Sequence, residues 1–164
     1  MINVRNRSLL ATFAFALSCV LAPVDAGDND VYVRIVQVKA TGERKEKHAE
    51  MDKALEPFRE HLEEATKHAK YTLLGKSVAK KGAFGSPVGF DLENHYKAVA
   101  TPSVGTEKHI KLVLKVNKHE EKKDELVFEA TLDMKDAATA IQQIDKALEG
   151  ADLLLAVTAS RDSL

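Results

Sequence analysis

Three residues of this chain, His61, Glu64 and His68, have the types and spacing that could hold a metal ion. Steps of 3 and 4 residues place side chains on one side of a helix. Two imidazoles and a carboxylate are ligands that zinc and related ions accept. Glutamate and lysine residues surround the trio, however, which is typical of a solvated helix face. We therefore predict no catalytic, cofactor or metal site, and keep these three residues as the candidate metal ligands.

Nucleophilic catalysis finds little support. No serine stands in the Gly-x-Ser-x-Gly motif of hydrolases, and in Phe84-Gly-Ser-Pro-Val88 the proline opposes the helix that must follow such a serine. The only cysteine, Cys19, lies in an apolar N-terminal segment. His95 and His119 fall at expected turns or strand ends, where solvated imidazoles are common. The positions of these histidines indicate surface residues and not catalytic ones.

The first 26 residues are a predicted secretory signal peptide. Arg5 and Arg7 precede an uncharged apolar run, Leu9 to Leu21, and the segment ends in the small-residue site Val24-Asp25-Ala26. The run is too short to span a bilayer, which takes about 20 residues. We expect an exported protein, periplasmic or extracellular, without a transmembrane segment after cleavage. Acylation of Cys19, as in bacterial lipoproteins, is the alternative.

Cleavage after Ala26 would leave residues 27–164 as a single domain of 138 residues. Without Arg5, Arg7 and Asp25, the 24 basic and 25 acidic residues become 22 and 24, a net charge of −2. Such a chain has no large basic field for nucleic acid. Tryptophan is absent, which argues against a stacking platform for single strands or sugars.

One segment has the pattern of an amphipathic helix. From His48 to Ala69, apolar residues recur at steps of 3 and 4. Pro57 interrupts this segment, so either the helix kinks there or the proline lies in its first turn. With Asp52 as the N-cap, the helix is predicted over Lys53 to His68.

Most of the remaining chain has strand patterns. The run Val31–Val38 is β-branched and nearly continuous, as in a strand buried on both faces. Residues 110–117 and 125–133 alternate apolar and polar side chains around a charged turn, which predicts a hairpin with Asn117 facing Glu125. The segment Thr139–Leu148 fits either a helix or a hairpin arm. Other strands are expected at 71–79, 88–93, 96–101 and 153–159.

Four short patterns follow one another along the chain: Asp52-x-x-Leu55, Tyr71-Thr-Leu-Leu74, Val88-x-Phe90-x-Leu92 and Gly150-x-x-Leu-Leu-Leu155. In this order the chain resembles a group of small exported bacterial proteins of uncharacterised function, each a helix followed by an antiparallel β-rich domain. The resemblance covers roughly Val31 to Ala159. It implies a final hairpin, and therefore a strand over Thr139–Ile144, and it carries no functional residue.

The predicted fold is α+β, with one amphipathic helix packed on a mostly antiparallel sheet of about six or seven strands. We expect the helix stripe and the apolar row of the long hairpin to bury each other. The favoured function is a non-enzymatic binding or structural module whose partner is another envelope protein; the oligomeric state stays open.

Two other functions remain as alternatives. The first is an enzyme or small-ligand carrier with a pocket between helix and sheet, lined by Phe58, Leu62 and Phe128. The second is a secreted protease inhibitor, for which the turn from Lys81 to Pro87 is the candidate wedge.

Overall fold

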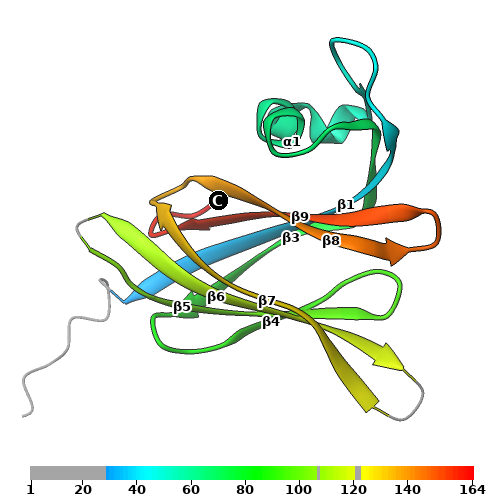
Figure 1. Ribbon diagram of the computed structural model, residues 1–164. Coiled ribbons are helices and arrows are strands. Elements are labelled where there is room, and N and C mark those ends of the chain that lie inside the picture. Colours follow the sequence, from blue (N-terminus) through cyan, green and yellow to red (C-terminus); the bar gives the residue numbers. More distant parts are fainter. Residues whose placement is uncertain (1–28, 107, 121–122) are drawn as a thin grey trace, which may run out of the picture.

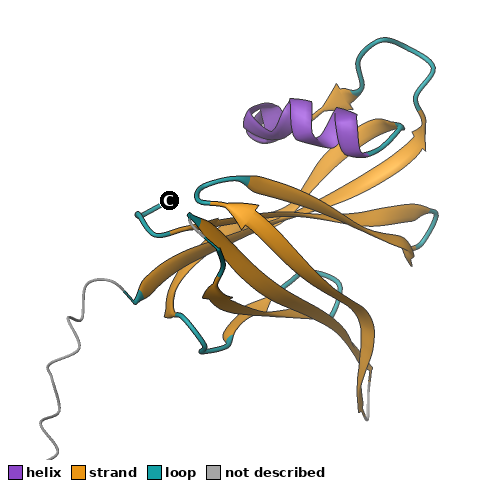
Figure 2. Cartoon of the chain, turned by 60° about the vertical axis from the view of Figure 1, so that its left-hand side comes forward, coloured by secondary structure: helices purple, strands orange, loops and turns teal. Residues whose placement is uncertain are grey.

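Three layers make up the fold, and the computed structural model describes them over residues 29–106, 108–120 and 123–164. A short helical segment lies on one side of a five-stranded sheet and a four-stranded sheet lies on its other side (Figure 1). Figure 2 shows the same stacking from a second direction. Within the described residues no helix is long and apolar enough to cross a membrane.

Sheet A, the five-stranded sheet, has the order β2-β3-β1-β9-β8, and sheet B has the order β4-β5-β6-β7. Every pairing is antiparallel except the short one between β2 and β3. The strands of sheet A are β1 (Asp30–Glu43), β2 (Glu50–Met51), β3 (His68–Ala83), β8 (Thr139–Leu148) and β9 (Ala151–Ser160). Those of sheet B are β4 (Val88–Asp91), β5 (Tyr96–Val104), β6 (His109–Glu120) and β7 (Lys123–Lys135).

The two central strands of sheet A, β1 and β9, are buried on both faces. Successive side chains of a strand point to opposite faces. On β1, Val31, Val33 and Ile35 therefore face sheet B, whereas Val36 and Val38 face the helix. The sequence prediction of a strand buried on both faces is confirmed for β1, which pairs with β3 on one edge and β9 on the other.

The predicted α+β class, with one helix and mostly antiparallel strands, is confirmed, but the single sheet of about six or seven strands is wrong, because the described residues form nine strands in two sheets. The apolar row of the β6–β7 hairpin packs against sheet A and not against the helix. The helix covers the opposite face of sheet A. A strand that is apolar on both faces needs a layer on each side, so the helix alone could not bury β1 and β9.

The helical segment is shorter than predicted. It consists of a 3-10 turn, η1 (Lys53–Phe58), which contains Pro57, and an α-helix, α1 (Arg59–Ala65). Thr66 adopts an extended backbone and its hydroxyl donates to the Leu62 carbonyl at 3.1 Å, which ends the helix before His68. Asp52 does not cap the helix with its side chain; its carboxylate accepts the Leu73 N–H at 2.8 Å and so joins the helix start to β3.

The long hairpin forms as predicted, but in a different register. Val116 pairs with Phe128, and a bulge follows, so Asn117 lies opposite Leu126 and not Glu125. The expected contact between lysines and acids is present: Lys115 Nζ lies 3.3 Å from the Glu129 carboxylate. The apolar row of β6 and the part of the β7 row from Phe128 to Leu132 still share the face toward sheet A, because a shift of two residues preserves the alternation. Leu126, beyond the bulge, is exposed.

The ambiguous segment Thr139–Leu148 is strand β8, as the final hairpin implied by the resemblance requires. It pairs with β9 through a turn in which Gly150 has a φ of +65°. Glycine adopts this left-handed conformation without the steric cost that other residues meet.

Tyr71 joins the end of α1 to sheet A, which generates a first prediction. Its hydroxyl, fully buried, lies 2.8 Å from Thr66 Oγ1 and donates to the Leu62 carbonyl at 3.2 Å. Tyr71→Phe should lower the free energy of unfolding by about 1–2 kcal/mol, measured by urea denaturation. Tyr32→Phe, at a partly exposed tyrosine of β1, is the matched control and should change little. Equal losses in both variants would contradict the assignment.

Glu63 of α1 fastens the helix to the preceding loop. Its carboxylate, 13% exposed, accepts the Ala49 N–H at 3.0 Å and Arg59 Nη1 at 2.9 Å, and lies 3.2 Å from His48 Nδ1. The Ala49 N–H, with smaller contributions from His48 and Arg59, lowers the pKa of Glu63 from its ordinary value of 4.5. A lowered pKa means that the folded state favours the ionised carboxylate.

The second prediction follows from this pKa. The stabilisation by Glu63 is present above pH 4.5 and is lost as the pH falls through the lowered pKa. Glu63→Gln should therefore cost about 1 kcal/mol at pH 7 and much less near pH 3, measured by denaturation at both pH values. The exposed Glu60→Gln on the same helix is the control. A pH-independent loss in Glu63→Gln would rule out the charge as the cause.

Candidate functional site

The predicted metal trio does not converge. His61 and Glu64 lie exposed on α1, whereas His68 begins strand β3, because the helix ends at Ala65. The spacing of 3 and 4 residues places side chains together only within a continuous helix. Among the described residues, no three histidine, cysteine, aspartate or glutamate side chains are grouped so that they could hold a metal ion.

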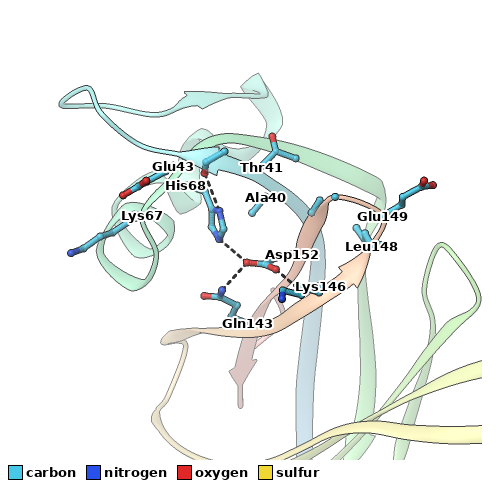
Figure 3. Close-up of a pocket in the computed structure, with 13 residues that line it drawn as sticks. Ala40, Thr41, Glu43, Lys67, His68, Gln143, Lys146, Leu148, Glu149 and Asp152 are labelled. Carbon is cyan, nitrogen blue, oxygen red and sulfur yellow. Dashed lines mark hydrogen bonds and ion pairs between the residues drawn. The ribbon is translucent and has the colours of Figure 1, made fainter.

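His68 instead lies at a hollow of about 840 Å³ on sheet A (Figure 3). One wall of the hollow is the end of β1 with the start of β3, and the other wall is the tip of the β8–β9 hairpin. Its volume falls in the range of roughly 300–1,000 Å³ that is usual for ligand sites. The residues that line it are Ala40, Thr41, Gly42, Glu43, Lys67, His68, Gln143, Lys146, Leu148, Glu149, Gly150, Ala151 and Asp152.

Asp152 is the polar centre of this hollow. Oδ1 accepts the Lys146 N–H at 2.7 Å, and Oδ2 accepts Gln143 Nε2 at 2.9 Å. His68 Nε2 lies 3.2 Å from the same Oδ2, and the two side chains are 18% and 19% exposed. Figure 3 shows these three groups directed at the Asp152 carboxylate from different sides. The carboxylate therefore connects β3, β8 and β9.

His68 makes a second contact through its other ring nitrogen. Nδ1 lies 3.3 Å from the Gly42 carbonyl of β1. Both neighbours of the ring, this carbonyl and the Asp152 carboxylate, are hydrogen-bond acceptors. A neutral imidazole donates through one nitrogen only, so the ring donates to the Gly42 carbonyl in the tautomer that carries its proton on Nδ1. The imidazole thus bridges β1 and the hairpin across the hollow.

A bulge in β8 explains why Asp152 receives a backbone N–H. Ile144 pairs with Leu153 and Leu148 pairs with Ala151, so three residues of β8 lie opposite the single residue Asp152. Lys146, at the middle of the bulge, has a φ of +51°, a region that non-glycine residues seldom adopt. The bulge also directs a carbonyl toward sheet B, where the hydroxyl of Tyr96 donates to the Ala147 carbonyl at 2.6 Å.

A second feature that a partner could contact is the edge of sheet B. Strand β7 pairs with β6 alone, so its other edge has backbone groups without a strand partner in the described part of the chain. Leu126 and Val127, at the bulge of this strand, are 51% and 36% exposed. An edge strand with apolar side chains is a template for pairing with another chain.

The other sequence-predicted sites take different positions. Phe58 and Leu62 pack in the cluster under the helix, whereas Phe128 packs between the sheets, so the predicted pocket of these three residues does not form. In the turn proposed as an inhibitor wedge, Phe84 is partly buried against the inter-sheet core and lies beneath the Arg161 guanidinium. The leader and Cys19 lie outside the described residues.

Sequence reasoning missed Asp152 as the partner of His68, and Gln143 as a donor to the same carboxylate. Asp152 reads as a turn residue after Gly150, and 84 positions separate it from His68. The available signal was the position of Asp152 just before the predicted strand 153–159. If the segment Thr139–Leu148 pairs with that strand, Gln143 and Asp152 lie near the same hairpin tip.

The third prediction concerns the hairpin tip. Asp152→Ala removes the acceptor of the Lys146 N–H and of Gln143 Nε2 and the carboxylate that His68 contacts, which should cost about 1–3 kcal/mol locally. Amide hydrogen exchange in 144–148 should then accelerate roughly tenfold or more. Asp145→Ala, at an exposed neighbour bonded to Gln143, is the matched control and should leave this exchange nearly unchanged. Identical protection in both variants would show that Asp152 does not hold the bulge.

Comparison of the chain with protein-family models, with curated proteins and with solved structures found no match in any of the three.

Proposed function

We propose that this protein is an exported, non-enzymatic binding or structural module that contacts another protein of the cell envelope through the free edge of strand β7. The observation that carries the proposal is the exposure of Leu126 and Val127, 51% and 36%, on an edge strand of 13 residues. Main-chain groups of such an edge bind an added strand, and neighbouring side chains select it.

The charges of β7 also bear on the choice of partner. Glu125, Glu129 and Asp133 project from the strand together with Lys123 and Lys135 at its ends. Glu129 and Asp133 already face Lys115 and His109 on β6. These ion pairs protect part of the edge from indiscriminate pairing. The apolar pair at the bulge is the part that stays accessible, and it supports a single, local contact.

The export component rests on the leader. Arg5, Arg7 and the apolar run to Leu21 support secretion and cleavage after Ala26. Once the leader is removed, the remaining chain contains no cysteine, so packing and hydrogen bonds alone stabilise it outside the cytoplasm. Strands β1 and β9, which are buried on both faces, supply that packing.

The fourth prediction tests both components in one experiment. The full chain, with a photo-crosslinking amino acid at Val127, is expressed in its native cells and irradiated. We expect one stoichiometric partner protein, and N-terminal sequencing of the captured chain should begin at Gly27. The matched control is the same amino acid at Val104, which is 64% exposed at the end of β5.

A second substitution makes the outcome specific. Val127→Lys adds a positive charge to the edge, and natural edge strands use such charges to prevent pairing. With the crosslinking amino acid at a neighbouring position, this variant should capture the partner protein roughly tenfold less, which corresponds to about 1.4 kcal/mol of binding free energy. Equal capture from positions 127 and 104, or none from either, would refute the β7 contact. An intact leader on the captured chain would refute the predicted cleavage.

A further inference from the structure

We propose that the free edge of β7 binds a strand of the partner protein that is basic on one face and apolar on the other. This inference rests on the proposed function, because it names the chemistry of the partner at the same edge. The basic face of the added strand would continue the outer face of sheet B, which points away from sheet A. Strand β6, which pairs with β7 on its other edge, is the template for such a strand.

A row of carboxylates lies on the outer face of β7. Leu132 is buried toward sheet A, so Asp133 and Glu129 point outward. Asp124 continues the row beyond the bulge, where its carboxylate lies 2.6 Å from His119 Nδ1. Each of the three acidic side chains is about half exposed, and no lysine or arginine lies between them along the strand. The outer face of this edge is therefore acidic.

Strand β6 shows how this row is recognised. Lys115 Nζ lies 3.3 Å from Glu129 Oε1, and His109 Nδ1 lies 3.0 Å from Asp133 Oδ1. Lys111 is the register partner of Asp133. Opposite charges across a strand pair stabilise the pairing, and like charges destabilise it. A strand added on the free edge meets the same carboxylates from the other side, so the same rule favours lysine or arginine opposite Glu129 and Asp133.

The two carboxylates can each accept a second cation. In the described part of the chain, hydrogen bonds and ion pairs reach Oε1 of Glu129 and Oδ1 of Asp133, and none reaches the other oxygen of either group. A carboxylate has about four acceptor positions on its oxygens. A basic side chain of an added strand can therefore bind without displacing Lys115 or His109. The charges that exclude most strands from this edge would then select one with complementary charges.

The inner face of β7 favours apolar side chains in the added strand. Phe128 and Ala130 pack against the inter-sheet core but stay partly exposed. Their register partners on β6, Val116 and Leu114, are fully buried. Apolar side chains of an added strand would cover Phe128 and Ala130 from the free edge, as β6 does from the other. In Figures 1 and 2 the end of the β6–β7 hairpin extends beyond sheet A, in agreement with the exposure of this end of β7.

A second copy of this chain fits the edge poorly. Its own β7 carries the same acidic row, so two β7 edges would bring like charges together. Strand β3 has lysines, but Lys80 and Lys81 are neighbours in the strand and point to opposite faces. Lys80 donates to the Gly89 carbonyl, and Lys81 lies 2.6 Å from the Asp30 carboxylate. The charges therefore favour a strand of a different protein.

The test uses the ¹⁵N-labelled protein and a peptide with the sequence of residues 109–117, acetylated and amidated at its ends. We expect chemical-shift changes in the β7 amides in two-dimensional ¹H–¹⁵N NMR. A peptide with Lys111→Gln and Lys115→Gln keeps the apolar face but loses both cross-strand charge pairs, so it should bind about fivefold more weakly. This preference should shrink at about 1 M salt, because salt screens exposed charges.

The matching variant of the protein is Glu129→Gln/Asp133→Asn, which should bind the two peptides equally. Glu60→Gln/Glu64→Gln removes the same charge from exposed positions of α1 and is the control, which should keep the preference for the lysine peptide. Loss of the preference in both variants would overturn the assignment to the acidic row.

The outcomes separate this inference from the proposed function. Equal binding of both peptides to the unmodified protein, with shifts on β7, would overturn the basic strand and leave the β7 contact in place. Shifts only outside β7, or none at millimolar peptide, would overturn the basic strand too, while the crosslink at Val127 reports the β7 contact independently. A dimer in sedimentation that Val127→Lys dissociates would identify a second copy as the occupant and would also overturn the inference.

Discussion

The burial of β1 and β9 on both faces is the constraint on which the rest of the fold depends. Side chains of β9 from Leu153 to Ser160 are almost fully inaccessible, whichever face they point to. Burying one leucine or valine side chain contributes about 1.5–3 kcal/mol, so neither face could be left to solvent. Sheet B covers one face along its length, and the short helical segment covers part of the other.

This constraint also decides what the sequence could and could not predict. The near-continuous apolar runs of β1 and β9, the alternation in β6 and β7, and the helix stripe around Leu62 identified most elements, because each signal is local. The layer order was missed, since alternation gives the number of buried faces but not the element that covers each. The helix ends at Thr66, whose hydroxyl contacts the Tyr71 hydroxyl of β3, and a contact between a helix end and a neighbouring strand is not visible in the periodic pattern of either element.

The candidate site was less predictable than the fold for the same reason. His68 was singled out for its spacing from His61 and Glu64, and its real partners come from β1 and the final hairpin. A contact between two side chains 84 residues apart leaves no periodic trace in a sequence. The bulge opposite Asp152 leaves none either, because Lys146 is an unusual residue for a positive φ. Local strain of this kind is typical of positions that the surrounding contacts over-determine.

The hollow itself follows from two opposing attachments at one end of sheet A. The end of β1 and the start of β3 are attached to the helix, because Glu63 accepts the Ala49 N–H and the Tyr71 hydroxyl donates to the Leu62 carbonyl. The β8–β9 hairpin is attached to sheet B, because the Tyr96 hydroxyl donates to the Ala147 carbonyl. Two strands that pair as far as Ala40 and Asp152 must then separate. The contact between His68 and Asp152 limits that separation, so the hollow is the geometric result of covering one sheet with a helix on one face and a second sheet on the other.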